Sequence, residues 1–296
     1  MSRPLKPGRP AWKDVRAILD AEDFHPSRRL GQNFLLDENM VQRIALDTEL
    51  EAGDFALEIG TGCGFLTSHI AAIGAEIVSV EIDQRLMRVA ELLLAGWENV
   101  SLIHQDVLAG KHQLAPEVLE RLPKTRAWHA VGNLPYSVAS PLMVVLARLA
   151  QPPKSMTALV QAEVAERVAA KPGGKQWGPL SARLQIQYKA INLRNVPPQL
   201  FWPRPKVESA VLRLTIRPEQ PSKERLERFD TLVDCLFQSR RKAALGLLAK
   251  AIGSRELANG LLDRLGIEPD IRAGSFQPEQ LMEMADSDEW TSACAD

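Results

Sequence analysis

The sequence predicts an α/β fold in which a mostly parallel sheet, with antiparallel strands at one edge, is followed by a small all-helical domain. Short apolar runs alternate with stretches of helical periodicity from residue 55 to about 160, which is typical of a parallel sheet covered on both faces. Two further strand-like runs, 191–196 and 209–216, are joined by a proline-rich segment too short for a crossover helix, so we expect them to pair antiparallel. From about residue 218 the pattern is purely helical, and Pro218 and Pro221 mark the boundary.

The individual elements follow in order along this pattern. Residues 1–26 are expected to form a loosely attached extension with one amphipathic helix at 12–21, and Asp37 is a plausible N-cap for a helix that runs to residue 50. Strands are predicted at 55–59, 76–80, 100–103, 127–132 and 156–160, with helices at 65–73, 83–94, 138–149, 162–170 and 180–188. The predicted domains are the extension at 1–26, a sheet domain at 27–217 and a helical domain at 218–296.

The composition is that of a globular protein without a membrane span. Of 296 residues, 45% are hydrophobic and 25% charged, and no apolar run approaches the roughly 18 residues that a spanning helix needs. The first ten residues are basic and proline-rich with no apolar stretch behind them, so we expect no secretory signal and a cytoplasmic location. Cys63, Cys235 and Cys294 are odd in number and far apart, which predicts reduced thiols and no metal site.

Charge is distributed unevenly, although the net charge is only −1. Residues 167–207 contain no Asp or Glu, and a basic triplet follows at 240–242, whereas the segment after residue 255 holds ten acidic residues against two arginines. The basic residues of the carboxylate-free stretch are Arg167, Lys171, Lys175, Arg183, Lys189, Arg194, Arg204 and Lys206. Such a stripe favours a polyanionic partner, although a solvated charged face is the commoner cause of any single Lys or Arg.

A glycine-rich loop joins the first predicted strand to the helix that follows it. The loop reads Leu57-Glu58-Ile59-Gly60-Thr61-Gly62-Cys63-Gly64-Phe65. Its glycines allow the backbone to approach a ligand closely and leave helix-end N–H groups free. Phe65 stands where the dinucleotide-binding pattern needs Gly or Ala, which disfavours a nicotinamide-dependent oxidoreductase.

A carboxylate stands at the end of each of three successive predicted strands: Glu58, Glu81 and Asp106. Ligands of open α/β sheets bind outside the carboxyl ends of the strands, where Glu81 could accept the hydroxyls of a ribose and Asp106 an adenine amino group. This layout resembles the class I S-adenosylmethionine-dependent methyltransferases, and the resemblance implies their Rossmann-like fold and their cofactor. It also implies that the cationic methionine end of the cofactor lies near Glu58 and the loop glycines Gly60 and Gly62.

The apolar run at 127–132 leads into the turn Asn133-Leu134-Pro135-Tyr136. Asn133 offers one acceptor and two donors, Pro135 stiffens the turn, and Tyr136 adds a flat face for stacking. These properties suit a planar ring that carries an amino group, so the chain looks like an amino-methyltransferase acting on adenine. The ordinary alternative is a turn that only ends a strand.

Four further stretches make the resemblance closer, from about residue 27 into the C-terminal helices. They are Arg28-Arg29-Leu30-Gly31-Gln32-Asn33-Phe34-Leu35, Phe201-Trp202-Pro203-Arg204-Pro205-Lys206-Val207, Glu208-Ser209-Ala210-Val211-Leu212-Arg213-Leu214 and Phe237-Gln238-Ser239-Arg240-Arg241-Lys242. Together with the turn they resemble the KsgA/RsmA family of small-subunit ribosomal RNA adenine N6,N6-dimethyltransferases. The resemblance implies dimethylation of two adjacent adenosines in a hairpin loop near the 3′ end of that RNA, linked to maturation of the 30S subunit.

The resemblance also implies roles for individual residues. The catalytic group is Asn133, Leu134, Pro135 and Tyr136, and the target adenine lies between Tyr136 and Phe201, with Trp202 as an alternative to Phe201. The implied cofactor contacts are Gln32, Asn33, Leu35, Glu58, Gly60, Gly62, Glu81, Asp106 and Asn133. The residues expected to contact the RNA include Arg204, Lys206, Arg240, Arg241 and Lys242.

The expected partner is small-subunit rRNA within a pre-30S particle, bound by a monomeric enzyme. A large-subunit rRNA adenine dimethyltransferase is an alternative that the stretches 201–207 and 237–242 disfavour. A DNA adenine methyltransferase should carry a base-reading module, and none is recognisable in the sequence. An assembly factor that acts mainly by binding is the alternative from another class, and the intact motifs favour catalysis over it.

Overall fold

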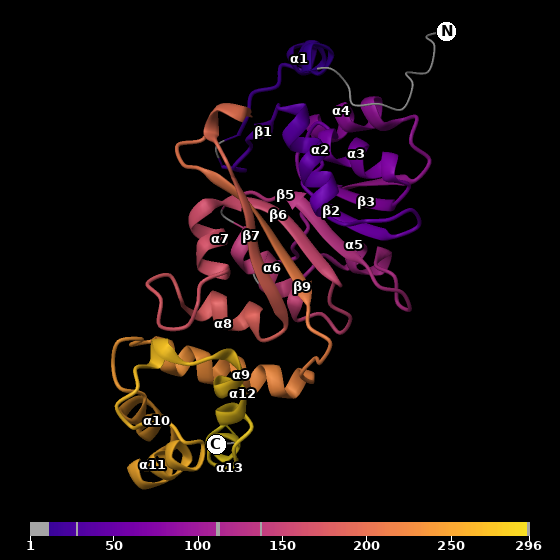
Figure 1. Ribbon diagram of the computed structural model, residues 1–296. Coiled ribbons are helices and arrows are strands. Elements are labelled where there is room, and N and C mark those ends of the chain that lie inside the picture. The colour runs from indigo at the N-terminus through magenta and orange to yellow at the C-terminus, as the bar shows by residue number, and fades with distance from the viewer. Residues whose placement is uncertain (1–11, 28, 111–112, 137, 295–296) are drawn as a thin grey trace. The chain divides into compact units, whose positions relative to one another are not determined.

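The computed structural model describes residues 12–27, 29–110, 113–136 and 138–294, which form two compact units (Figure 1). The first unit runs to Ala165 and resumes at residues 191–215, and the second comprises residues 166–190 and those from Ile216 onward. The chain enters the second unit for the last time after residue 215, close to the predicted boundary after residue 217. Residues 166–190, however, belong with the C-terminal helices and not with the sheet domain. Trp177 and Ile186 are buried in the same apolar cluster as Leu226 and Phe229. Helical periodicity shows which face of a helix is apolar, but it does not show against which core that face packs.

The first unit is built on a seven-stranded sheet in the order β4-β3-β2-β5-β6-β9-β7 (Figure 1). The pairs from β4 to β6 are parallel, and β9 joins β6 antiparallel, which confirms the predicted mostly parallel sheet. The strands are β2 (Phe55–Ile59), β3 (Glu76–Glu81), β4 (Val100–His104), β5 (His129–Asn133), β6 (Ser155–Gln161), β7 (Tyr188–Val196) and β9 (Ser209–Ile216). The two runs predicted to pair at the edge, β7 and β9, are neighbours there.

Two helices of the first unit begin after an Asp that caps them, and one of these caps, Asp37, was predicted. Asp37 accepts a hydrogen bond from the Met40 N–H at 2.8 Å, and Asp83 accepts one from the Arg85 N–H at 2.9 Å, so each caps the helix that follows it. The helices are α1 (Trp12–Ala21), α2 (Glu38–Asp47), α3 (Phe65–Ile73), α4 (Gln84–Leu94), α5 (Pro116–Arg121), α6 (Ala139–Ala147) and α7 (Ala162–Val168), the last of which crosses between the units. Helix α2 is shorter than predicted, and α5 was not predicted.

The prediction of a loosely attached N-terminal extension is wrong for the residues described. On α1, Val15 is 0% and Leu19 1% exposed, and both pack into the cluster that contains Phe34 and Phe65. Phe34 and Leu35 form β1 (Phe34–Leu35), which pairs antiparallel with β8 (Phe201–Trp202) after the short helix η1 (Pro198–Leu200). The amphipathic pattern of α1 indicated an apolar face. The residues that cover this face are distant in the sequence, so the pattern did not reveal that α1 packs on the unit. Residues 1–11 and Arg28 lie outside the described residues.

The second unit is helical, apart from the start of β7 and the last residue of β9. Its helices are α8 (Pro179–Gln185), α9 (Lys223–Phe237), α10 (Ala244–Ile252), α11 (Arg255–Arg264), η2 (Ala273–Ser275), α12 (Pro278–Ala285) and α13 (Asp288–Ala293). The helix predicted to reach residue 188 ends at Gln185, and residues 188–190 belong to β7 instead. No helix in the described part of the chain is both long enough and apolar enough to span a membrane.

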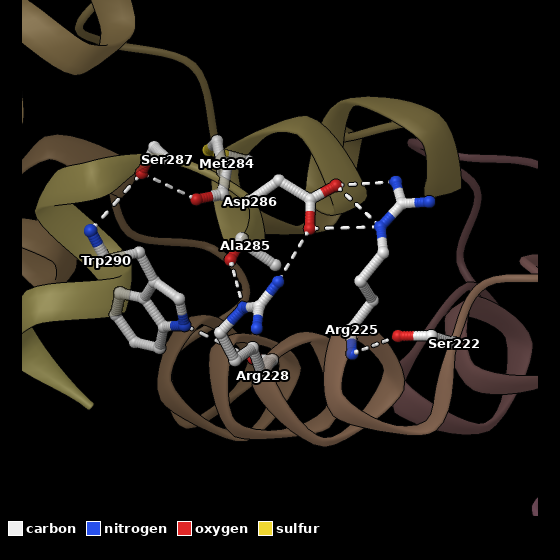
Figure 2. A network of polar contacts seen from close by, with 8 residues as sticks. All are labelled: Ser222, Arg225, Arg228, Met284, Ala285, Asp286, Ser287 and Trp290. Carbon is white, nitrogen blue, oxygen red and sulfur yellow. Dashed lines mark hydrogen bonds and ion pairs between the residues drawn. The ribbon is translucent and has the colours of Figure 1, made fainter. Parts of the chain in front are cut away.

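Asp286, which follows α12, connects that helix to α9 (Figure 2). Its carboxylate accepts hydrogen bonds from Arg225 Nε at 3.0 Å and from Arg228 Nη2 at 3.1 Å, while Trp290 Nε1 donates to the Arg228 carbonyl at 3.2 Å. Burial raises the pKa of Asp286, but the bonds from the two arginines outweigh it and hold the pKa below its ordinary value. Part of the acidic excess after residue 255 is therefore paired inside this unit.

Candidate active site

The carboxyl ends of β2, β3 and β5, with the segment that follows β4, surround a cavity of about 200 Å³. Parallel neighbours end at the same edge of a sheet, so residues far apart in sequence meet there. The lining includes Gly60, Gly62, Glu81, Asp106 and Asn133, all of which the sequence predicted as site residues. Gln32, Asn33 and Pro135 line the same cavity.

Glycines shape the backbone at this edge. Gly60 and Gly62 have φ angles of 84° and 56°, in the region that side chains disfavour, so the loop can turn tightly above β2. At Gly132, one residue before Asn133, a Cβ atom would lie 2.4 Å from the Ile59 carbonyl oxygen. Only glycine therefore lets the end of β5 lie so close to the end of β2.

Glu81 ends β3 inside the cavity wall, with both carboxylate oxygens engaged. Oε2 accepts a hydrogen bond from the Gly62 N–H at 2.8 Å, and Oε1 accepts one from the Asp83 N–H at 2.9 Å. Burial raises the pKa of Glu81 above its ordinary value, against the lowering effect of these N–H bonds. Each carboxylate oxygen has a second lone pair, so the group can still accept hydroxyl hydrogens from a ligand.

Glu58 lies deeper than the other two acids and does not line the larger cavity. It is 1% exposed, and its Oε2 accepts hydrogen bonds from Thr67 Oγ1 and Ser79 Oγ, each at 2.6 Å. It lines a smaller cavity of about 60 Å³, together with Gly60, Gly62 and Asn133. Burial raises the pKa of Glu58 to about 7, although the two hydroxyl bonds lower it.

Asn133 is the last residue of β5, and its side-chain amide has a defined orientation. Its Nδ2 donates to the Asn33 carbonyl oxygen at 2.8 Å. Because a carbonyl can only accept, the nitrogen must face Asn33, and the side-chain oxygen Oδ1 is the other atom. Among the described residues, Oδ1 accepts no hydrogen bond. Leu134 is buried, and its N–H donates to the Leu159 carbonyl at 3.0 Å, which holds the turn against β6.

The segment 29–35 forms one wall of the site. The Asn33 side chain donates to the Gly31 carbonyl at 3.0 Å, and a Cβ atom added at Gly31 would lie 3.5 Å from Pro135 Cβ. The side chain of Gln32 donates a hydrogen bond to the Asp83 carboxylate and accepts one from the Ser27 backbone N–H. Leu35 lines the smaller cavity and not the larger one.

The aromatic residues predicted to hold a base have different surroundings. Tyr136 is half-buried, and its hydroxyl is 2.8 Å from Ser209 Oγ at the start of β9. Phe201 is 5% exposed and belongs to the core of the unit. The Trp202 ring stacks on Phe34 with centroids 5.9 Å apart and contacts Trp12 at 5.4 Å. Neither Tyr136 nor Phe201 lines either of the two cavities.

The predicted basic residues separate into two groups. Arg204 and Lys206 are exposed on the loop after β8, in the first unit. Arg240, Arg241 and Lys242 belong to the second unit and lie in the turn between α9 and α10, not on a helix. Within the carboxylate-free stretch, Arg183 pairs with Asp230 and Asp234, and Arg194 pairs with Asp47, so these two arginines are engaged in ion pairs.

Asp83 and Phe34 are site residues that the sequence reasoning did not single out. Asp83 bonds both Gln32 and Glu81, and Phe34 lines both cavities. The spacing Glu81-Ile82-Asp83 at the start of a helix was a usable signal for Asp83, because Asp is a preferred N-cap. Phe34 carried no such signal, since an apolar residue beside a polar loop is ordinary.

The chain is similar to known proteins in both sequence and structure. The family model described as ribosomal RNA adenine dimethylase matches residues 24–288. The ribosomal RNA small subunit methyltransferase A of Shouchella clausii is 38% identical over 279 residues, covering 92% of this chain and 93% of the relative. Its counterpart from Nitratidesulfovibrio vulgaris is 38% identical over 262 residues, covering 88% and 95%.

Two solved structures share the fold. The 23S rRNA methyltransferase ErmE has 25% identity and a TM-score of 0.67 and covers 86% of this chain and 98% of its own. A dimethyladenosine transferase from Plasmodium falciparum has 20% identity and a TM-score of 0.70, with coverage of 84% and 94%. The predicted class I methyltransferase fold and the resemblance to small-subunit enzymes are thus confirmed, and the chain belongs to the ribosomal RNA adenine dimethylase family.

Proposed function

We propose that the protein dimethylates the N6 amino groups of two adjacent adenosines in a 3′-terminal hairpin loop of small-subunit rRNA, using S-adenosylmethionine. The observation that carries the proposal is the amide of Asn133, whose oxygen accepts no hydrogen bond among the described residues while its nitrogen is held by Asn33. Relatives named small subunit methyltransferase A, 34–38% identical to the chain, support the choice of RNA. We further propose that the protein acts in the cytoplasm as a monomer on a pre-30S particle.

The residues around the cavity fit this cofactor. Glu81 can accept hydroxyl hydrogens of a ribose, Asp106 can accept from an adenine amino group, and the loop at Gly60 and Gly62 leaves room for close backbone approach. Glu58 lines the smaller cavity beside Gly60 and Gly62, where its carboxyl in the ionised form would face a cationic methionine end. The segment 29–35 forms another wall of the site, with Gln32 and Asn33 at the larger cavity and Leu35 at the smaller one. When bound, the cofactor supplies an electrophilic methyl group on a sulfonium.

Asn133 and the turn after it are proposed to orient the acceptor amine. The lone pair of an adenine N6 is delocalised into the ring, so it reacts only when its hydrogens are held and its developing charge is stabilised. Asn133 Oδ1 and the Leu134 carbonyl accept those hydrogens and direct the lone pair toward the methyl group, so positioning and electrostatics provide the rate. The turn residues include no carboxylate or imidazole. The alkylated amine is far more acidic than the amine, so it releases its proton to water.

Tyr136 is proposed to stack on the target base once the base has left its helix or loop stack. Phe201 can provide the second face only if segment 201–202 moves, because the ring is 5% exposed. Trp202 has the same requirement, since Phe34 and Trp12 contact its ring.

The proposal is tested by incubating small-subunit rRNA particles with the protein and isotope-labelled cofactor and mapping the product by mass. We expect two dimethylated adenosines next to each other in the 3′-terminal hairpin. Asn133→Ala should reduce transfer by roughly a hundredfold or more, as does loss of one group that stabilises a transition state, with only moderate weakening of cofactor binding. Asn195→Ala, at an exposed position on β7, is the matched control.

The alternatives predict other products in the same experiment. Methylation of large-subunit RNA alone would indicate the activity named for ErmE, which is 25% identical to this chain. Binding to the particle without transfer would indicate an assembly factor. Unchanged transfer by Asn133→Ala would contradict the assignment of the turn.

A further inference from the structure

Gln32 lies in a continuous chain of hydrogen bonds that connects the wall segment to the acid at the end of β3. Its Oε1 accepts from the Ser27 N–H at 2.7 Å, and its Nε2 donates to Asp83 Oδ2 at 2.9 Å. The Asp83 N–H then donates to Glu81 Oε1 at 2.9 Å, and Glu81 Oε2 accepts from the Gly62 N–H at 2.8 Å. Ser27 is therefore connected to the glycine-rich loop through side chains from two distant parts of the sequence.

The next residue along the chain bonds the opposite side of the cavity. The carbonyl of Asn33 accepts from Asn133 Nδ2 at 2.8 Å. Consecutive residues of one segment therefore bond Asp83, whose N–H donates to Glu81, and the amide of Asn133. Gly31, in the same segment as Gln32 and Asn33, lies close to Pro135 of the turn, since an added Cβ would be 3.5 Å from Pro135 Cβ. A shift of segment 29–33 would therefore disturb both Glu81, through Asp83, and Asn133.

We infer that Gln32 is a positioning residue, which holds segment 29–33 against Asp83 and thereby sets the geometry of Glu81 for the cofactor. This differs from a direct cofactor contact, because both ends of the Gln32 amide already bond protein atoms. Asp83 is 8% exposed, and Gln32 supplies a donor to this nearly buried carboxylate without adding charge. The inference rests on the proposed cofactor site.

Exchanging the donor at position 32 with the acceptor at position 83 distinguishes a positioning role of Gln32 from a direct contact with the cofactor. Gln32→Glu places a carboxylate against Asp83 and should raise the Kd for S-adenosylhomocysteine roughly tenfold or more, since hydrogen bonds to charged groups are among the stronger ones. Asp83→Asn places two amide nitrogens against each other and should also weaken binding. In the double variant, the amide introduced at position 83 donates to the carboxylate introduced at position 32, and Asn remains a good N-cap for α4. Binding should then return to within about threefold of wild type.

Calorimetric titration of the whole protein with S-adenosylhomocysteine measures these affinities, and thermal unfolding checks that each variant folds. Gln42→Glu, on the exposed face of α2, is the control with the same charge change. Recovery in the double variant supports the positioning role. A double variant that binds no better than the worse single variant, or single variants that bind like wild type, would overturn it. Failure of the wild-type protein to bind would instead reject the cofactor site itself.

Discussion

Tyr136 combines a polar and an aromatic function that can be separated by substitution. Its hydroxyl bonds Ser209, and its half-buried ring is proposed to stack on a base. Tyr136→Phe removes a bond with a net value of about 1 kcal/mol and keeps the ring, so rRNA affinity should stay close to wild type. Tyr136→Ala removes a stacking contact of ~1–3 kcal/mol and should weaken rRNA binding about ten- to a hundredfold, with cofactor binding little changed. Filter binding with rRNA and cofactor titration measure the two effects; equal losses in both variants would contradict a stacking role.

Glu58 makes the stability of the first unit depend on pH. Its pKa is about 7 in the folded protein against an ordinary value of 4.5, so the folded state keeps the proton in a range where the unfolded chain releases it. The resulting stabilisation is fully present below pH 4.5 and is lost as the pH rises to about 7. Its size is on the order of 3 kcal/mol, because one pKa unit corresponds to about 1.4 kcal/mol.

Glu58→Gln should therefore remove this part of the pH dependence. The amide cannot ionise, but its oxygen can still accept from Thr67 and Ser79. The free energy of unfolding of the variant should fall less than that of wild type as the pH rises from 4.5 to 7, whatever its absolute value. Denaturant unfolding at several pH values gives both slopes, with the exposed Glu51→Gln as control. Parallel curves for wild type and Glu58→Gln would show that the buried carboxyl does not retain its proton.

At the scale of elements, the three basic residues in the turn between α9 and α10 differ in their surroundings: Arg240 is hydrogen-bonded within the unit, whereas Arg241 and Lys242 are exposed. Arg240 Nη1 donates to the Trp177 carbonyl at 2.5 Å, and the Arg240 carbonyl accepts from the Gly274 N–H at 2.9 Å, so this residue joins three segments of the second unit. Arg241 and Lys242 are exposed. Their charges are thus the part of the triplet available for phosphate.

Arg241→Gln with Lys242→Gln should reduce the salt dependence of rRNA binding. Each phosphate contact contributes roughly 0.7–0.9 to the slope of log K against log salt, so the double variant should lose about 1.5. Lys250→Gln with Arg255→Gln removes two exposed charges elsewhere in the same unit and serves as control. The slope is measured by titration at several salt concentrations. An equal decrease in both double variants would indicate a general charge effect and not contact through this turn.

Helix α1 shows where element-scale prediction succeeds and where it ends. Its amphipathic pattern predicted a helix at 12–21, and the helix has these bounds. The pattern did not identify the surface that the apolar face covers. Val15 and Leu19 of that face pack into the cluster that contains Phe34, and Arg16 lies over the Trp202 ring, 4.8 Å from its centroid. Residues far apart in the sequence thus attach α1 to the unit.

Across the whole molecule, the sequence by itself determined the parallel sheet and the site at its edge. The strand β2 is buried at every position and is apolar except at Glu58, which is the pattern of a strand covered on both faces. Glu81 and Asn133 end β3 and β5, and Asp106 closely follows β4, so parallel pairing brings all three to the same edge of the sheet.

Only the tertiary structure decided how these residues are supported. The bonds from Gln32 to Asp83 and from Asn133 to Asn33 join residues 51 and 100 positions apart, and no local periodicity encodes such pairs. For the same reason, the sequence did not reveal that residues 166–190 belong with the C-terminal helices or that Phe201 is buried. Local pattern determines which face of an element is apolar and which residue ends it. The partner of that face depends on the packing of the whole chain, because burial is a property of the assembled core.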